Sequence, residues 1–236
     1  MFSTDDTENL GNDFEFAEQD VRHGFIKKVY AILTAQLALT IAIIIPFVYV
    51  DEIRLYMFRN SWPFWVAFAM TLILIIALSC FTNLRRNFPI NFICLFLFTV
   101  FEGVLLGIAC GRYETNTILI AAGITAIIVL ALTVFAFQTK IDFTMFSGLL
   151  FALLIGLLIF GIFAAIFHNR VLDIVYASVG AIIFAMYIVF DTQLLLGGKH
   201  KYSISQEEYI FASLNLYIDI VQMFMLMLTL VNSARG

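Results

Sequence analysis

Seven long apolar runs limit what this chain can fold into more than any other feature of its sequence. Each run is 22 to 27 residues long and contains at most one charged side chain. An α-helix needs about 20 apolar residues to cross the hydrocarbon core of a bilayer. The sequence therefore predicts an all-α integral membrane protein with seven transmembrane helices. We place these helices at residues 29–50, 62–82, 89–110, 117–137, 146–167, 173–195 and 209–231.

Composition supports a membrane protein and argues against a nucleic-acid-binding one. Hydrophobic residues make up 62% of the chain and charged residues only 13%, against about 45–50% and about 25% in ordinary soluble domains. A soluble fold of this composition would have too little polar surface to face water. The net charge of −4 offers no basic face to nucleic acid. We expect the lipid bilayer as a partner and no nucleic acid.

Charged residues are concentrated before the first apolar run. Ten of the 30 charged residues precede residue 29, and seven of the ten are acidic. Residues 1–21 contain few aliphatic side chains, so they cannot bury enough apolar area to offset chain entropy. We therefore expect a disordered acidic tail at 1–21 and a single seven-helix transmembrane domain at 22–236.

The distribution of Lys and Arg predicts the orientation in the membrane. Eight of these residues lie in the N-terminal segment and in the loops that follow the second, fourth and sixth helices, whereas five lie on the opposite side. This bias places the N-terminus in the cytosol. It does not decide whether the last segment spans the membrane or is re-entrant, so the side of the C-terminus stays open.

Three acidic residues, Glu102, Asp191 and Asp219, lie inside predicted transmembrane helices. A charge near the bilayer centre costs about 2.5–3.5 kcal/mol on insertion scales, and such residues commonly mark functional sites. Asp219 lies near the middle of the last helix, with Asn215 and Gln222 one turn away on the same face. Because this polar stripe would be unfavourable against lipid, we expect the last helix to be surrounded by the others.

Asp191 lies about one turn inside the end of the sixth predicted helix, with Tyr187 one turn before it. Helices joined by a short loop are usually neighbours, so Asp191 and Asp219 are predicted to meet. Two carboxylates that share a site cannot both ionise cheaply, and they titrate as a unit. Such a pair would sense protons and, once ionised, would offer oxygen ligands to Ca²⁺. The alternative, in which an acid only joins helices by hydrogen bonds, is equally open for Glu102.

Two arginines, Arg85 and Arg86, follow the second predicted helix on the same side of the membrane as Asp191. They are either ordinary cytosolic flanking charges or a latch in which one of them pairs with Asp191 and closes an ion path. Ser205 and Glu208 have the spacing of a helix-capping box before the last helix. That spacing predicts a structural role for Glu208 and leaves Glu207 free to lie at a pore mouth.

Enzymatic functions have little support in the sequence. HExxH, GxSxG and P-loop motifs are absent, and the three cysteines have no CxxC spacing. Two membrane aspartates also occur in intramembrane aspartyl proteases, but there the second one follows Gly-x-Gly, whereas Tyr217 and Ile218 precede Asp219 here. We expect no catalytic residues, no enzyme activity and no cofactor. Asp191 and Asp219 are the only candidate metal ligands.

Several segments strongly resemble the transmembrane BAX inhibitor motif proteins, also called lifeguard proteins. The similarity covers nearly all of the chain from about residue 22, and the part between 187 and 220 is highly specific. The Gly-Gly-Lys-His loop at 197–200 resembles in particular the glutamate-receptor-associated branch. The segments that carry the resemblance are Phe25-Ile-Lys-Lys-Val-Tyr30, Phe101-Glu102-Gly103, Phe190-Asp191-Thr192-Gln193, the loop from Gly197 to Tyr209, and Leu214-Asn-Leu-Tyr-Ile-Asp219-Ile220.

The resemblance implies a seven-helix fold with a central last helix, a pH-dependent calcium leak, and suppression of apoptosis from the endoplasmic reticulum or Golgi. In the family, two aspartates form the calcium and pH sensor, which transfers to Asp191 and Asp219. The family's arginine latch transfers best to Arg85. The long Pro/Gly-rich N-terminus of some members is absent, so partner binding that depends on it is not implied.

Three functional hypotheses follow. The first is a calcium-leak channel of internal membranes that lowers stored Ca²⁺. The second is a non-conducting adaptor that binds calcium-release channels or apoptosis regulators. The third is a proton-coupled transporter.

Overall fold

The computed structural model describes the backbone of residues 4–167, 169–197 and 200–235 and, within these ranges, the side chains from Asp20 onward. Every regular element in this part of the chain is helical, and seven helices are long and apolar enough to cross a membrane. The predicted all-α fold is confirmed. The candidate spans are Asp20–Tyr49 within α1 (Thr4–Tyr49), α3 (Trp62–Cys80), α5 (Ile90–Cys110), α6 (Thr115–Gln138), Phe143–Phe167 comprising η1 (Phe143–Phe146) and α7 (Ser147–Phe167), α8 (Arg170–Leu196), and Gln206–Arg235, which contains α9 (Tyr209–Arg235).

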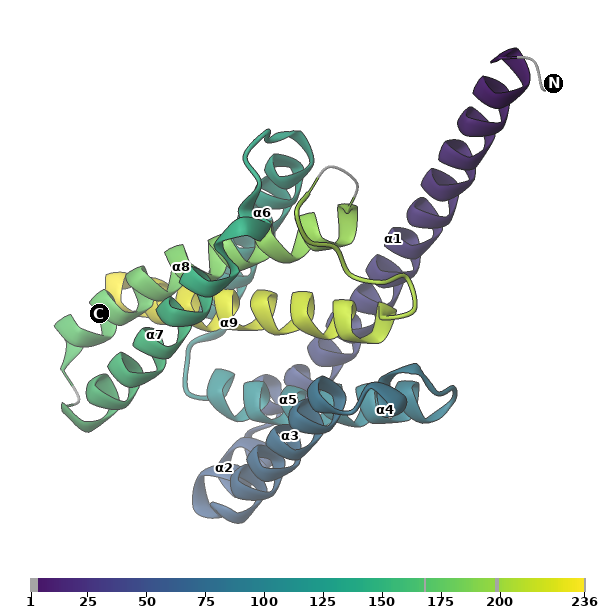
Figure 1. Cartoon of the computed structure of the whole chain (residues 1–236). Helices are drawn as coiled ribbons and strands as arrows, with labels where there is room; N and C mark the ends of the chain where they lie inside the picture. Colours follow the sequence, from purple (N-terminus) through teal and green to yellow (C-terminus); the bar gives the residue numbers. More distant parts are fainter. Residues whose placement is uncertain (1–3, 168, 198–199, 236) are drawn as a thin grey trace.

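The first helix begins earlier than the sequence predicts. Where we expect a disordered tail at 1–21, the backbone of α1 is helical from Thr4 and continues without a break to Tyr49. Its first turns project away from the bundle (Figure 1). Extending an existing helix avoids the unfavourable nucleation step, so a polar segment can be helical without tertiary contacts. Residues 1–3 lie outside the described residues.

Two short helices join successive spans at opposite ends of the bundle. One is α2 (Asp51–Arg59), between α1 and α3, and the other is α4 (Thr82–Arg86), between α3 and α5. Because α3 crosses the bundle between them, α2 and α4 lie at different ends. Arg85 and Arg86 form the last turn of α4.

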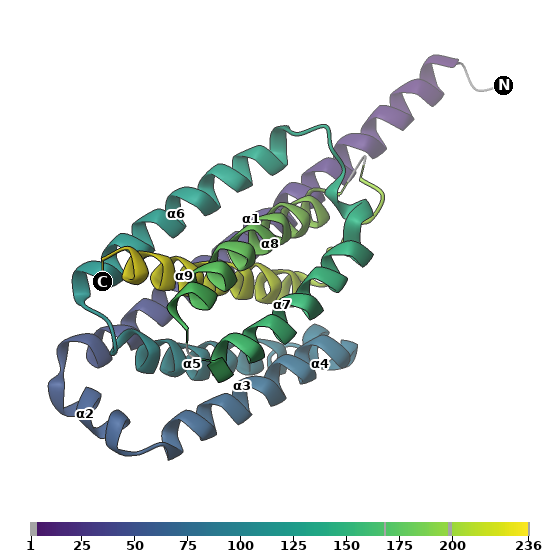
Figure 2. The ribbon, with the colours of Figure 1, turned by 90° about the vertical axis from the view of Figure 1, so that its left-hand side faces the viewer.

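The last helix, α9, is the central helix, as predicted. It contacts α1, α5, α6 and α8, and Figure 2 shows it enclosed by the other spans. The part of α9 up to Val221 belongs to one apolar core with α1, α3 and α5, whereas the part from Met223 belongs to a second core with α6, α7 and α8. Asp219 therefore lies where the two cores adjoin.

α9 also runs the full length of the bundle. Glu208, just before its first turn, forms an ion pair with Arg85 of α4, and Arg235 in its last turn donates a hydrogen bond to Thr117 at the start of α6. The whole of α5 separates α4 from the start of α6, so these two contacts lie at opposite ends. This favours a complete crossing for the last helix over a re-entrant segment.

Close packing of α1 against α5 depends on two glycines. Gly103 and Gly107 are four residues apart, so they lie on one face of α5. A Cβ at Gly107 would lie 2.6 Å from Cδ2 of Phe47, and one at Gly103 would lie 3.0 Å from Cδ1 of Ile43. Small residues at this spacing let two membrane helices approach closely. The outward faces of the spans remain apolar and exposed, as lipid-facing surfaces require.

Candidate functional site

Asp191 and Asp219 meet inside the bundle, as the sequence predicts. Asp191 lies five residues before the end of α8, and Asp219 lies ten residues after the start of α9. The two helices pack against one another over much of their length, which brings these positions together. Each residue is only 5% exposed. The pair is therefore enclosed by protein at the depth of the membrane.

The two carboxyl groups lie close enough for a hydrogen bond between them. A carboxyl group donates a hydrogen bond only when it is protonated, so this contact is favourable when one of the two carries a proton. The Oδ2 atom of Asp219 has no hydrogen-bond partner in the part of the chain that the structure describes. An unpaired buried acceptor is costly.

A pocket of about 290 Å³ reaches Asp219 from between α7, α8 and α9. Two of the predicted supporting residues, Tyr187 and Gln222, line it together with Asp219, and Tyr187 is near enough to both aspartates to interact with their charges. The remaining wall is mostly apolar. The lining residues are Leu154, Leu157, Leu158, Tyr176, Phe184, Tyr187, Ile218, Asp219 and Gln222.

Two other predicted residues lie outside this pocket. Asn215 is half-buried on α9 and does not line it. Glu102, on α5, lies near Tyr217, which is two residues from Asp219 and so points to nearly the opposite face of α9. The structure therefore separates Glu102 from the aspartate pair.

A buried chain of polar side chains joins α1, α5 and α9 and was not predicted from the sequence. Gln36 donates a hydrogen bond of 3.0 Å from Nε2 to Thr99, and the hydroxyls of Thr40 and Tyr217 share one of 2.7 Å. Glu102 lies beside this chain through its proximity to Tyr217. The spacing of Gln36 and Thr40, one turn apart on α1, is the only signal in the sequence that could have indicated it.

The arginines bind a different acid from the predicted one. Arg85 and Arg86 both form ion pairs with Glu208, and Arg86 also pairs with Glu207 at 2.9 Å. The side chain of Glu208 is 6% exposed, Arg85 17%, Arg86 41% and Glu207 71%. Among the described residues, Arg85 and Arg86 pair with Glu208 and Glu207 rather than with Asp191, so the predicted latch on Asp191 is not formed in this structure.

The arginines pair with Glu208 rather than Asp191 because of where each residue lies along the axis of the bundle. Arg85 and Arg86 belong to α4, which lies at one end, whereas Asp191 is more than one turn inside α8. Glu208 stands immediately before α9, at the same end as α4. The predicted capping box is also not formed, because the Glu208 carboxylate is used by the arginines. We call Arg85, Arg86 and Glu208 the arginine clamp.

A second network holds the end of α8 that carries Asp191. Oε1 of Gln193 accepts a hydrogen bond of 2.7 Å from the backbone N–H of Phe143, and its Nε2 donates one of 2.9 Å to the carbonyl of Ile141. Asp142, between these two residues, accepts from the backbone and hydroxyl of Thr144 and from the backbone of Lys201. The loop before α7 is thus tied to both α8 and the loop that follows it.

Arg22 of α1 is attached to the same region. Its guanidinium donates hydrogen bonds to the carbonyls of Leu194, Leu196 and Ile204 at 2.9 to 3.3 Å. Carbonyls in the last turn of a helix lack helical partners, and a cation satisfies them well. From the sequence, Arg22 is only one of the basic residues of the N-terminal segment that favour a cytosolic N-terminus.

Asp142 lies between two spans and makes stability depend on pH. Burial raises the pKa of its carboxyl group, but the hydrogen bonds from Thr144 and Lys201 and the nearby His200 lower it more, so its pKa is below the ordinary value. A carboxylate with a depressed pKa stabilises the fold above its unfolded-state pKa, and this contribution is lost as pH falls through the folded-state pKa.

We therefore expect Asp142→Asn to lower the melting temperature of the detergent-solubilised protein by a few degrees at pH 7. The difference from wild type should shrink as pH falls below about 4, the unfolded-state pKa of an Asp, and should be lost once the folded-state carboxyl group is also protonated. Melting curves of both proteins between pH 3 and 7 check this. A constant difference across that range would show that the charge of Asp142 is not responsible.

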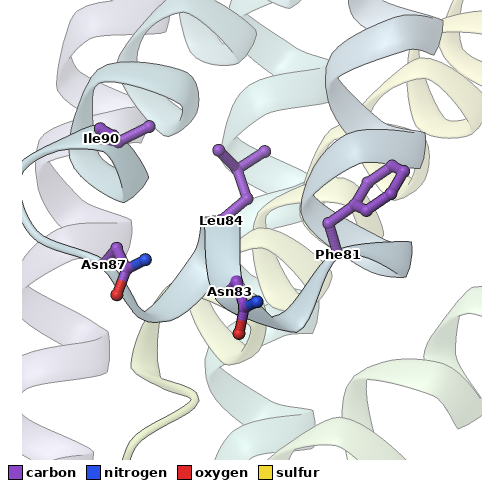
Figure 3. Close-up of a pocket in the computed structure, with 5 residues that line it drawn as sticks. All are labelled: Phe81, Asn83, Leu84, Asn87 and Ile90. Atoms are coloured by element: carbon purple, nitrogen blue, oxygen red, sulfur yellow. The ribbon is translucent and has the colours of Figure 1, made fainter.

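A second hollow, of about 360 Å³, lies where α3, α4 and α5 meet. Figure 3 shows its five lining residues, with Leu84 between Phe81 and Ile90 and with the amides of Asn83 and Asn87 at one edge. None of the five is charged. It offers a cation only neutral amide oxygens and no carboxylate, so we do not associate it with the aspartate pair.

Among the described residues, no group of three or more His, Cys, Asp or Glu side chains could hold a metal ion. Two carboxyl groups with neutral oxygens around them are fewer ligands than the six to eight that Ca²⁺ takes in a tight site.

Comparison with known proteins identifies the family. Residues 22–236 match the family described as "Inhibitor of apoptosis-promoting Bax1". The chain belongs to this BAX inhibitor family. Within it, the chain is 40% identical to Protein lifeguard 3 of Mus musculus over 223 residues, which are 93% of this chain and 72% of that protein. Protein lifeguard 3 of Homo sapiens is also 40% identical, over 92% of this chain and 70% of its own length.

Protein lifeguard 4 of Mus musculus is 34% identical over 94% of this chain and 90% of its own length. The predicted resemblance to lifeguard proteins is confirmed. BAX inhibitor proteins are associated with inhibition of apoptosis and are not a known class of enzymes. The region that carries the Asp191 and Asp219 pair lies within the matched residues.

Proposed function

We propose that this protein lets Ca²⁺ leak across an internal membrane and thereby suppresses apoptosis. The observation that carries the proposal is the contact between the buried carboxyl groups of Asp191 and Asp219 on adjacent helices. Keeping two acids at this depth is unfavourable, and such residues commonly mark a function. Exchange of a shared proton for a cation is a function that such a pair can perform. Membership of a family associated with inhibition of apoptosis supports the cellular role.

The geometry suggests how conduction would be controlled. With a shared proton the two carboxyl groups contact each other and leave no room for a cation between them. Loss of that proton makes them repel, and the same oxygens become ligands for Ca²⁺. Gln222 and Tyr187 would add neutral oxygens from the pocket beside Asp219. The arginine clamp holds one end of α9 and would restrain it while the path is closed.

The membrane of residence follows from the same proposal. A leak can lower stored Ca²⁺ only if the protein lies in the membrane of a Ca²⁺ store. We therefore place the protein in the endoplasmic reticulum or Golgi with its N-terminus in the cytosol. The Arg85, Arg86, Glu207 and Glu208 group then faces the cytosol. Calcium-release channels and apoptosis regulators stay predicted partners that this mechanism does not require.

Ca²⁺ binding is expected to fall as pH falls. Protons and Ca²⁺ compete for the same carboxylate oxygens, so acidification protonates the pair and expels the cation. Wild-type protein in detergent, titrated with ⁴⁵Ca²⁺ between about pH 5 and 8, should lose binding toward pH 5. Asp191→Asn and Asp219→Asn should each flatten this dependence, because the remaining acid has no partner to repel.

An unchanged pH profile in both variants would show that the two acids do not act as a unit. Efflux of Ca²⁺ from liposomes that contain only the purified protein tests conduction itself. A folded protein that supports no efflux at any pH would favour the adaptor hypothesis over the channel.

A further inference from the structure

The lining of the pocket beside Asp219 combines polar and apolar side chains. Asp219, Gln222 and Tyr187 contribute polar groups, whereas the leucines of α7 with Phe184 and Ile218 are apolar. None of the described residues that line it is basic. The Asp219 residue therefore borders a mostly apolar space to which none of the described lining residues brings a positive charge.

The position of the pocket indicates from where it can be filled. Its α7 residues, Leu154 to Leu158, lie in the middle of that helix, and Asp219 is the eleventh of the 27 residues of α9. The pocket is thus at the depth of the hydrocarbon core rather than at either water-facing end. Leu158 is 59% exposed on the outer face of the bundle, so the pocket has an edge toward lipid.

We propose that this pocket binds a membrane-soluble amine, with its ammonium group on Asp219 and its hydrocarbon body against the leucines of α7. A buried carboxylate in an apolar setting is stabilised best by a paired cation with hydrogen bonds. A protonated amine supplies the positive charge that none of the described lining residues brings, together with N–H donors for the carboxyl group. Its hydrocarbon part replaces lipid contacts at the pocket wall.

The volume sets the size of the ligand. About 290 Å³ is close to the lower bound of about 300 Å³ for small-molecule pockets. At roughly 30 Å³ for each water-sized unit, it holds about ten such units. A single-chain amine such as octylamine, with nine non-hydrogen atoms, is of this size.

The test is binding of octylamine to the full chain in phosphatidylcholine nanodiscs, measured by calorimetry with empty nanodiscs subtracted. Octanol and octanoate are the matched neutral and anionic probes. Saturable binding of one octylamine per protein is expected, with octanol and octanoate bound at least about tenfold more weakly, since a hydrogen bond to a charged group contributes at least that factor. Asp219→Asn should reduce octylamine affinity by a similar factor.

Two tryptophan variants keep the test independent of the folding of Asp219→Asn. Leu158→Trp adds bulk at the lipid-facing edge of the pocket and should weaken octylamine binding, whereas Ile159→Trp, at a neighbouring position that is 53% exposed and outside the pocket, should not. Equal affinity for octanol and octylamine would overturn the proposal in favour of a plain acyl-chain pocket. Absence of saturable octylamine binding, or equal affinity in Leu158→Trp and wild type, would also overturn it. Because the readout is amine binding, the result does not depend on whether the protein conducts Ca²⁺.

Discussion

Asp219→Asn is expected to abolish most of the Ca²⁺ efflux from liposomes that contain the purified protein. The amide keeps the shape of the side chain and much of its hydrogen bonding, but it removes the only ionisable oxygen pair on α9 within the membrane. Loss of one contact between a charged ligand and the ion corresponds to a reduction of at least about tenfold in efflux rate. Fluorescence of a trapped Ca²⁺ indicator after addition of an external chelator measures that rate.

The matched control is Asp173→Asn in the first turn of α8. Asp173 is an acid at the far end of the helix that carries Asp191, so its replacement should leave efflux nearly unchanged. Circular dichroism and size-exclusion chromatography show whether each variant is folded. Full efflux in a folded Asp219→Asn protein would remove Asp219 from the ion path and would leave the buried pair with a purely structural role.

Glu208→Gln is expected to destabilise the protein and to raise the resting leak. The substitution leaves Arg85 and Arg86 without the carboxylate that both contact, and removal of one partner of a buried ion pair costs about 3–5 kcal/mol. Because Arg86 is partly exposed and can be rehydrated, we expect a loss of about 2 kcal/mol, which is below that range. Freed from the clamp, the first turn of α9 can move relative to α4. Denaturant titration measures the stability, and the liposome assay measures the leak.

The neighbouring acid provides the control for the clamp. Glu207 is mostly exposed and pairs only with Arg86, and exposed ion pairs contribute about 1 kcal/mol or less. Glu207→Gln should therefore leave both stability and leak close to wild type. For the same reason Arg85→Ala should have the larger effect of the two arginine substitutions. If Glu207→Gln and Glu208→Gln raised the leak equally, a general surface-charge effect would replace the clamp as the explanation.

The number of spans and the meeting of Asp191 with Asp219 could be predicted because both follow from local constraints. A run of about 20 apolar residues has few alternatives to a membrane span, and the charges between the runs mark the turns. A connection of 12 residues joins the end of α8 at Leu196 to the start of α9 at Tyr209, and these consecutive helices are adjacent and antiparallel. Two polar residues within the first few turns on either side of such a connection are confined to a small region of the bundle, so they lie near one another.

The partner of the arginines could not be predicted in the same way. From the sequence, Arg85 could reach any acid on its side of the membrane, including Asp191, Glu207 and Glu208. The choice depends on how far α4 extends, on the rotation of α9 and on the depth of each acid along its helix. None of these is set by hydropathy or spacing, and the structure places Glu208 closest to the end of α4.

By itself the sequence determined the seven spans, the alternation of their ends and the central position of α9, because apolar run length and the cost of a buried polar stripe act within single helices. The tertiary structure alone decided which polar groups pair across helices. It joined Arg22 to the carbonyl end of α8, Gln193 to the loop before α7, and Tyr217 to Thr40. Each of these contacts forms only when two parts of the bundle have one particular rotation and height relative to each other. That arrangement is set by the packing of the whole bundle and not by a single helix.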